Sequence, residues 1–372
     1  MEQIKKNFGF GCMRLPMTDD EVDIPQTKRM VDVFLEAGFN YFDTAHGYIQ
    51  GKSETALREC LTSRYSREQY ILTDKLTNIF FKEEADIRPF FEGQLKACGV
   101  DYFDYYLMHA QGADNFKHFK ACRAYETAFA LKDEGKVRHV GISFHDRAEV
   151  LEQILTEYPQ IEVVQIQFNY VDYDDPAVEG CKCYEVCRKH GKPVIVMEPV
   201  KGGNLVNLPA DAKAVLDELQ GGSPASYAIR FAAGFPGIMM VLSGMSNMEQ
   251  MEDNLSFMKD FQPLDERELA AVGKVQEIFK NMNLISCTAC RYCIDGCPQH
   301  IAIPDLFAVM NIKQIYQDWN ADYYYNVVHT APGRKASDCI GCGVCEKACP
   351  QHLQIRDLLA DVADEFEKQP TM

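Results

Sequence analysis

Short apolar runs rich in β-branched and aromatic residues recur about every 30 positions through roughly the first 250 residues. Between them, apolar residues return every three or four positions, which is typical of amphipathic helices. This alternation predicts a series of strand–helix units. The eight predicted strands are Phe8–Cys12, Asn40–Thr44, Tyr70–Lys75, Phe103–His109, Val137–Ser143, Val163–Phe168, Pro193–Glu198 and Ile238–Ser243. The predicted helices include Glu83–Cys98, Ala121–Asp133, Ala148–Tyr158, Ala177–His190 and Asn247–Met258.

Eight such units favour a closed (β/α)8 barrel of the α/β class, the TIM barrel, over an open sheet. An open doubly wound sheet usually carries a Gly-x-Gly-x-x-Gly turn after its first strand. The segment Gly9–Arg14 does not complete that pattern. The sequence therefore predicts a barrel over residues 1–262.

The composition changes after the barrel. Pro263 marks a break, and an amphipathic helix is predicted for Leu264–Met282. Residues from 286 onward are rich in cysteine, with a helical insert expected around Trp319 and Tyr323–Tyr325. We expect a linking helix over residues 263–285 and a small, mostly α-helical domain over residues 286–372.

Charge and hydropathy exclude some classes of partner. The 372 residues carry a formal net charge of −17, and no basic segment is concentrated enough to neutralise the phosphates of a nucleic acid. No apolar run reaches the roughly 18 residues that a membrane span needs. The first residues lack the apolar core of a signal peptide. A cytoplasmic protein with no nucleic-acid or membrane partner is expected.

Eight of the 15 cysteines lie between Cys287 and Cys349, which in a reducing compartment indicates metal binding. The pattern Cys-x-x-Cys-x-x-Cys-x-x-x-Cys-Pro occurs twice, as in bacterial ferredoxins, and predicts two 4Fe–4S clusters in a ferredoxin-like domain. Structural zinc, the alternative, usually takes two separated Cys-x-x-Cys pairs. In the ferredoxin arrangement the fourth cysteine of each run crosses to the other cluster. The resulting ligand sets are Cys287, Cys290, Cys293 and Cys349 for one cluster, and Cys339, Cys342, Cys345 and Cys297 for the other.

Polar residues stand at the C-terminal ends of the second, third and fourth predicted strands, or shortly after them. Asp43, Lys75 and His109 stand at strand ends, and Tyr48 lies in the loop after Asp43. Catalytic groups of a TIM barrel come from the C-terminal ends of its strands, so these four side chains are expected to converge. Taken singly, each also fits an ordinary surface residue or a helix cap.

The sequence motifs FDTAHGY, TDK and LMH contain these residues. They resemble motifs of the aldo-keto reductase family, in particular of its iron–sulfur-containing branch. The resemblance covers residues 8–260 and implies hydride exchange between NADPH or NADH and a small carbonyl or alcohol substrate. It implies that Tyr48 is the acid, that Lys75 stabilises its phenolate and that Asp43 holds Lys75. His109 would orient the carbonyl group by a hydrogen bond.

The same resemblance implies a set of nucleotide-binding residues, with Ser143 and Gln165 on the carboxamide. The sequence departs from it in two places. No Lys or Arg occurs between Arg230 and Lys259 to pair with the 2′-phosphate of NADP, and the seventh strand ends in an acid where many relatives have an aromatic residue. The implied cofactor-binding residues are Ser143, Gln165, Glu198, Lys201, Ser243, Gly244, Gln250 and Asn254.

Two functional hypotheses follow. The favoured one is an oxidoreductase that reduces carbonyl compounds or oxidises alcohols, coupled or adjacent to two 4Fe–4S clusters that communicate with an electron-transfer partner. The alternative is a nucleotide-binding redox sensor or electron-transfer subunit in which the clusters are structural. The complete set of Asp43, Tyr48, Lys75 and His109 favours catalysis.

Overall fold

The computed structural model describes residues 4–175, 178–282, 284–316, 321–322, 324–330 and 334–368. The chain forms two compact units. Residues 1–200 and 225–269 make up the first, called the barrel unit, and residues 201–224 and 270–372 make up the second, called the cysteine unit. Trp319 and Tyr323 of the expected helical insert lie outside the described residues.

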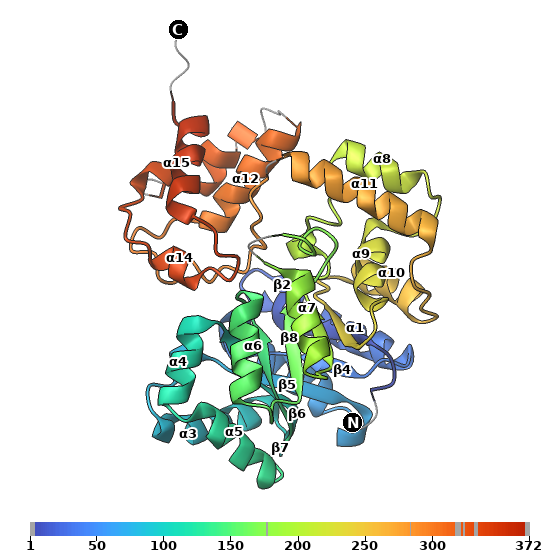
Figure 1. The fold of residues 1–372 in the computed structure, drawn as a ribbon, viewed down its shortest axis with the longest axis vertical. Helices are drawn as coiled ribbons and strands as arrows, with labels where there is room; N and C mark the ends of the chain where they lie inside the picture. Colours follow the sequence, from blue (N-terminus) through green and yellow to red (C-terminus); the bar gives the residue numbers. More distant parts are fainter. Residues whose placement is uncertain are drawn as a thin grey trace. The chain divides into compact units, whose positions relative to one another are not determined.

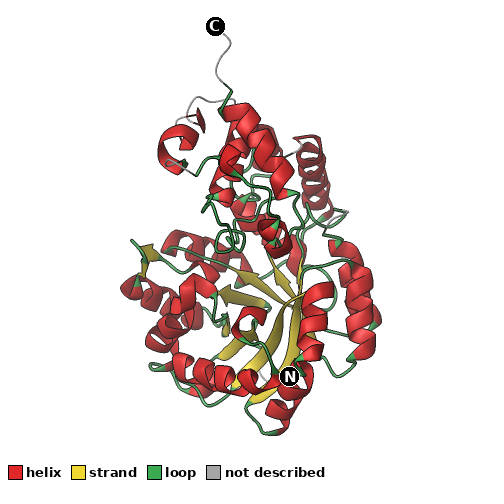
Figure 2. Cartoon of the chain, turned by 90° about the vertical axis from the view of Figure 1, so that its left-hand side faces the viewer, coloured by secondary structure: helices red, strands yellow, loops and turns green. Residues whose placement is uncertain are grey.

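Eight parallel strands close the barrel unit, in the order β1-β10-β9-β8-β7-β6-β5-β4. Figure 2 shows these strands as an inner layer with helices outside them. The TIM-barrel prediction is confirmed, and each strand lies where the apolar runs placed it. The strands are β1 (Phe8–Gly11), β4 (Tyr41–Asp43), β5 (Ile71–Leu76), β6 (Phe103–Gln111), β7 (Val137–Phe144), β8 (Val163–Gln167), β9 (Val194–Met197) and β10 (Ile238–Ser243), with a hairpin of β2 (Met17–Thr18) and β3 (Glu21–Val22) beside them.

The helices of the barrel unit bury one face each. In the first, the Asp23 side chain caps the N-terminus by accepting from the Gln26 N–H at 2.9 Å, and Met30 and Phe34 are buried one turn apart. Several of these helices surround the strands in Figure 1. They are α1 (Ile24–Glu36), α2 (Lys52–Leu57), α3 (Glu84–Cys98), α4 (Ala113–Ala121), α5 (Ala124–Asp133), α6 (Ala148–Glu157), α7 (Gly180–Lys189), α9 (Pro224–Ala233) and α10 (Met248–Met258).

Some helices begin later than predicted, among them α7, which begins at Gly180, and α5. The helix expected over Ala121–Asp133 begins at Ala124, and Ala121 instead ends the preceding helix. Arg123 adopts a φ of 52°, a left-handed conformation that interrupts helical hydrogen bonding. The apolar periodicity runs through both helices, which is why it did not reveal the break.

Strand register brings the polar residues to one edge of the barrel. Asp43 pairs with Thr73, and Lys75 pairs with Leu107. All three strands run in the same direction, so Asp43, Lys75 and His109 lie at their C-terminal ends. Below them, Gly141 has no room for a side chain, because an added Cβ would lie 2.5 Å from Val163 Cγ1. The apolar interior thus supports a polar rim.

The cysteine unit is mostly helical and has its own apolar core. In α15, Ile355, Leu359, Val362 and Phe366 recur at helical spacing and are buried. The ring of Tyr325 stacks on Phe366 with centroids 4.6 Å apart, so this part of the expected insert belongs to the core. The helices of the cysteine unit are α8 (Ala210–Asp217), α11 (Glu266–Met282, which starts in the barrel unit), α12 (Ile303–Tyr316), α14 (Val344–Ala348) and α15 (Ile355–Phe366).

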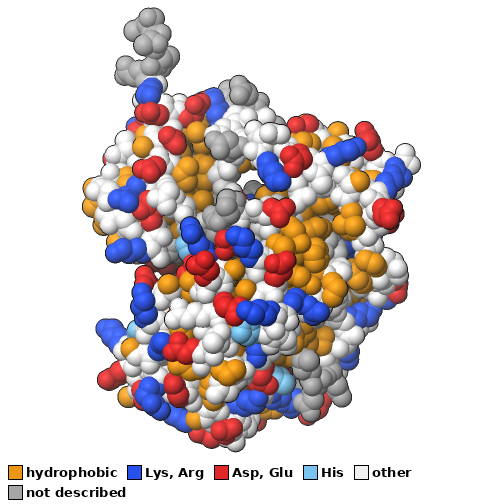
Figure 3. All heavy atoms as spheres, viewed as in Figure 1, with side chains coloured by type: hydrophobic (Ala, Val, Ile, Leu, Met, Phe, Trp, Pro, Cys, Tyr) orange, Lys and Arg blue, Asp and Glu red, His pale blue; other side chains and the backbone are white. Residues whose placement is uncertain are grey.

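Charge and hydropathy can also be followed in the structure. On the face drawn in Figure 3, basic and acidic side chains are interspersed rather than gathered into one basic field. Within the described ranges, no helix combines the length and the apolar character needed to cross a bilayer.

Candidate functional site

A buried ion pair forms the base of the site. Lys75 Nζ donates to Asp43 Oδ1 at 2.5 Å and to the Thr44 carbonyl at 2.8 Å. The Lys75 and Asp43 side chains are only 1% and 3% exposed. Burial raises the pKa of Asp43, while the Lys75 ammonium opposes that rise. Asp43 and the Thr44 carbonyl thus both accept from the Lys75 ammonium, and Asp43 Oδ2 is a buried oxygen without a hydrogen-bond partner among the described residues.

Tyr48 lies over this pair. It opens a short 3-10 turn, Tyr48–Gly51, in which Ile49 and Gln50 are left-handed. Lys75 Nζ is 4.7 Å from the centroid of the Tyr48 ring, a cation–π contact. Burial and the nearby carboxylate of Asp43 raise the pKa of Tyr48 well above its ordinary value. The Lys75 ammonium therefore lies over the ring of a phenol that is protonated at rest.

His109 completes the group of four. Its ring meets the Tyr48 ring nearly edge-on, with centroids 6.0 Å apart, and its Nδ1 lies 2.7 Å from Thr77 Oγ1. Burial lowers the pKa of His109 well below its ordinary value, and the positive charge of Lys75 lowers it further. A neutral imidazole of fixed orientation therefore stands beside the phenol. The structure brings all four predicted residues together.

Two of the expected nucleotide residues are neighbours in the barrel. Ser143 pairs with Gln165 in the register of β7 and β8. Ser143 Oγ accepts from the Ala110 N–H at 2.8 Å, while Gln165 Oε1 is buried without a hydrogen-bond partner among the described residues. An amide N–H₂ group, such as that of a nicotinamide carboxamide, is the kind of donor that this oxygen lacks.

Four more of the expected residues lie at the end of β10, in the loop after it and on α10. Asn254 Nδ2 donates to Ser243 Oγ at 2.8 Å, so these two stand together. Gln250 Oε1 accepts from the Ser246 N–H at 2.7 Å and thereby braces the start of α10. Gly244 lies beside the side chain of Arg14, whose carbonyl accepts from Ser246 Oγ at 2.9 Å. Sequence reasoning missed Arg14 because it comes from the far end of the chain, after β1.

Glu198 and Lys201 follow β9. Glu198 adopts a φ of 55°, and its carbonyl accepts from Asn169 Nδ2 at 2.9 Å. Lys201 is buried and belongs to the cysteine unit, whereas the other expected nucleotide residues belong to the barrel unit. The assignment of Glu198 and Lys201 to the nucleotide stays a prediction.

In the cysteine unit, the eight motif cysteines line two small cavities. Each cavity takes three cysteines from one motif and the last cysteine of the other, the crossed arrangement that the sequence predicts. Thiolates in this number and spacing fit a 4Fe–4S cluster. The first cavity is lined by Cys287, Cys290, Cys293 and Cys349, and the second by Cys297, Cys339, Cys342 and Cys345.

The loops of the two cysteine motifs differ in how far other residues shield them from solvent. Asn204 Nδ2 donates to the Cys287 carbonyl at 3.2 Å, and an added Cβ on Gly202 would lie 2.6 Å from the Thr288 carbonyl oxygen. Thr288 is accordingly 2% exposed, whereas Ile340, its counterpart in the second motif, is 62% exposed. The segment 201–204 therefore covers the first loop, a contact that no sequence pattern indicated.

Comparison with known proteins decides the family. The profile of the aldo/keto reductase family matches residues 7–277. The chain belongs to this family. A second profile, that of the 4Fe-4S dicluster domain, matches residues 286–354. The protein is thus an aldo/keto reductase, an oxidoreductase, with a C-terminal 4Fe–4S dicluster domain.

Relatives of known name are distant but cover most of the barrel. The NADH-specific methylglyoxal reductase of Escherichia coli is 26% identical in an alignment of 273 positions that covers 61% of this chain and 81% of that protein. The uncharacterized oxidoreductase YqkF of Bacillus subtilis is 24% identical in an alignment of 306 positions that covers 73% of this chain and 94% of that protein.

Solved structures show the same fold. The holo form of aldo-keto reductase AKR11C1 from Bacillus halodurans is 25% identical, with a TM-score of 0.58, over 72% of this chain and 91% of that one. An aldo-keto reductase from Klebsiella pneumoniae in complex with NADPH is 18% identical, with a TM-score of 0.60, over 74% of this chain and 96% of that one.

Proposed function

We propose that this aldo/keto reductase reduces a small carbonyl compound with NADH or NADPH, or oxidises the corresponding alcohol. The observation that carries the proposal is the buried Lys75–Asp43 pair beneath Tyr48, with neutral His109 at its side. The relative named as a methylglyoxal reductase supports a small carbonyl substrate. Because the activity needs all four residues in one place, their convergence favours catalysis over nucleotide sensing.

The reduced nicotinamide, when bound, supplies a hydride to the carbonyl carbon. The residues of the chain do the rest. His109 orients the carbonyl oxygen by a hydrogen bond, and Tyr48 gives its phenolic proton to the oxygen as negative charge develops there. The ammonium of Lys75, fixed by Asp43, stabilises the negative charge that then appears on Tyr48. In alcohol oxidation the proton returns to Tyr48.

Gln165 and Ser143 are the residues that we propose for the nicotinamide carboxamide. The unpartnered Gln165 Oε1 would accept from its N–H₂ group, and Ser143 would lie next to it in the adjoining strand. Ser243 and Asn254 are proposed for the adenosine end, together with Gly244 of the loop after β10 and Gln250 of α10.

NADH is expected to bind at least comparably to NADPH. Between Arg230 and Lys259 the chain has no basic residue for a 2′-phosphate, and Glu249, Glu252 and Asp253 add negative charge there. Fluorescence titration of the protein with each nucleotide measures the two dissociation constants. A preference for NADPH of about 100-fold, or about 2.7 kcal/mol, would contradict it. Arg14→Ala would then show whether Arg14 is the source, with the distant surface variant Arg88→Ala as control.

We further propose that the cysteine unit holds two 4Fe–4S clusters that exchange electrons with the nicotinamide and with an electron-transfer partner. The crossed lining of the two cavities supports two clusters rather than zinc. The second loop, with Ile340 exposed, is the side from which we expect a partner to approach.

Titration of the anaerobic protein with NADH or NADPH tests the coupling. Electrons that reach the clusters would bleach their visible absorbance, and we expect this bleaching with at least one of the two nucleotides. Dithionite, added afterwards, gives the full amplitude and serves as the control. If neither nucleotide bleaches clusters that dithionite reduces, the alternative of purely structural clusters is favoured.

A further inference from the structure

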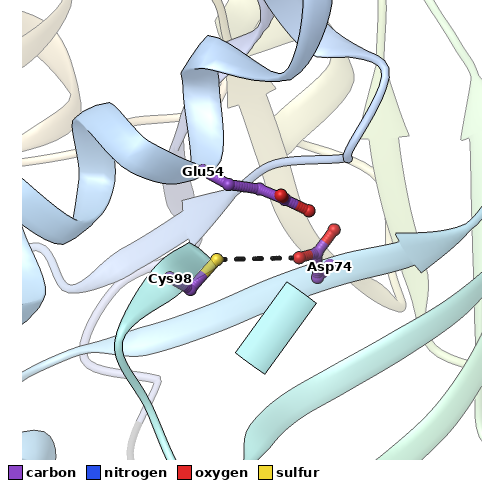
Figure 4. Close-up of side chains that lie close together, drawn as sticks. All are labelled: Glu54, Asp74 and Cys98. Atoms are coloured by element: carbon purple, nitrogen blue, oxygen red, sulfur yellow. Dashed lines mark hydrogen bonds between the residues drawn. The ribbon is translucent and has the colours of Figure 1, made fainter. Parts of the chain in front are cut away.

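Behind Lys75 lies a second group of acidic side chains that the mechanism above does not use. Glu54 of α2, Asp74 of β5 and Cys98 of α3 are fully buried, and their side-chain ligand atoms lie within 4.8 Å of one another. In Figure 4 the three side chains point toward one another from these separate elements, with the Cys98 thiol directed at Asp74 Oδ2 at 3.7 Å.

Gln94 lies between the two carboxyl groups. Its Nε2 donates to Asp74 Oδ1 at 3.0 Å and is 3.3 Å from Glu54 Oε1, while its Oε1 accepts from the Tyr106 hydroxyl at 2.6 Å. An amide donor aimed at both carboxyl groups takes the place in which a cation would have to sit. Burial, with the nearby acids, also keeps the pKa of Cys98 well above its ordinary value, so this sulfur stays a thiol. The group is therefore not suited to a metal ion.

The network holds the backbone of Lys75 on both sides. The Lys75 N–H donates to Asp74 Oδ1 at 2.7 Å, and the Lys75 carbonyl accepts from Gln94 Nε2 at 3.0 Å. The other end of the network reaches the loop that carries Tyr48, because Glu54 Oε2 lies 2.8 Å from Nδ1 of the partly exposed His46. The same side chains thus connect both elements that supply the proton-transfer residues.

We propose that Glu54 and protonated Asp74 form a proton-sharing carboxyl pair whose role is to position Lys75 and the Tyr48 loop. In this arrangement Asp74 donates its proton to the Glu54 carboxylate, and Glu54 accepts in turn from His46. Glu54 and Asp74 are positioning residues, since neither reaches the reacting atoms. The inference rests on the proposed function.

Electrostatics agrees with this arrangement. Burial and the adjacent Glu54 carboxylate raise the pKa of Asp74 well above its ordinary value, with Lys75 opposing the rise. The hydrogen bond to Glu54 raises the pKa of His46, so the imidazolium persists to higher pH than usual. Tyr106 and Cys98, the other titratable groups facing the pair, stay neutral because burial raises the pKa of each.

The first test needs no activity and compares the melting temperature of anaerobic holoprotein between pH 5 and pH 8. A carboxyl group whose folded pKa is raised stabilises the fold below its unfolded pKa, and this contribution is lost as pH rises toward the folded value. The amide of an Asp74→Asn variant does not titrate in this range, so the variant should gain in melting temperature relative to the wild type as pH rises. A difference that is constant or shrinks with pH would overturn the proton assignment.

The second test measures kcat, KM and iron content. Asp74→Asn should keep kcat within about threefold, because an amide donates to Glu54 as the protonated acid does. Glu54→Gln and His46→Gln should each lower kcat and kcat/KM about tenfold with iron content unchanged, since each disconnects the Tyr48 loop. Glu152→Gln, which breaks the comparable surface pair with His190 at 2.9 Å, is the control and should leave kcat unchanged.

His46→Gln changes only a partly exposed residue, so it remains informative if Glu54→Gln fails to fold. Unchanged kcat in His46→Gln would overturn the positioning role, and so would an Asp74→Asn variant that is as impaired as Glu54→Gln. A stoichiometric divalent metal beyond the cluster iron would overturn the proton-sharing pair itself. A wild-type protein that reduces no carbonyl compound would count against the proposed function alone, because the melting test stands without turnover.

Discussion

Tyr48→Phe is expected to lower kcat for carbonyl reduction by about 10²- to 10⁴-fold, the usual contribution of a positioned general acid. The substitution removes the phenolic proton but keeps the ring over Lys75 Nζ, 4.7 Å away in the present structure. Nucleotide affinity should therefore stay within about twofold, because the loss falls on the chemical step. Single-turnover kinetics with excess nucleotide separates the two quantities.

Tyr184→Phe is the matched control for this experiment. Its hydroxyl donates to the Pro236 carbonyl at 2.7 Å at an exposed position, so its removal should leave kcat unchanged. If Tyr48→Phe turned over as fast as the wild type, Tyr48 would not be the acid. Another group of the site would then have to supply the proton to the alkoxide.

Cys293→Ser is expected to reduce the iron content of anaerobically reconstituted protein from about eight to about four atoms per chain. Cys293 is the most buried of the cysteines that line the first cavity, at 7% exposure, and a serine hydroxyl there is a poor ligand for iron. The second cavity keeps all four of its cysteines. Iron and sulfide analysis with electron paramagnetic resonance counts the clusters that remain.

Cys181→Ser, at a partly exposed cysteine of α7 in the barrel unit, is the control and should retain about eight iron atoms. A wild-type protein with stoichiometric zinc and no iron would overturn the cluster assignment altogether. Unchanged iron in Cys293→Ser would instead show that the first cavity does not hold its cluster through this sulfur.

The apolar pattern was sufficient to predict the barrel, and motif order was sufficient to predict the group around Lys75. Each buried strand needs a short β-branched run, and parallel strands bring their C-terminal residues to one rim. Asp43, Lys75 and His109 therefore had to meet once the eight strands closed. The cysteine motifs were equally explicit, because their spacing is set by the cluster itself.

Contacts between segments that are distant in the sequence could not be predicted from it. Arg14 and Gly244 meet only because β1 pairs with β10 when the barrel closes. Asp74 and Glu54 are acids in an apolar strand and a short helix, and composition alone would place such residues at the surface. Their burial depends on Gln94, which only the docking of α3 supplies. Such information resides in the packing and not in any local pattern.

The crossed pairing of the cysteines also sets the order in which the two proposed centres can mature. During synthesis, the set that lines the second cavity is complete when Cys345 has been made, because Cys297 precedes it. The set that lines the first cavity already has three thiols at Cys293 but waits for Cys349. The centre begun first is thus finished last. A chain that stopped between these two late cysteines would carry one full ligand set and one site open to solvent or to the wrong metal.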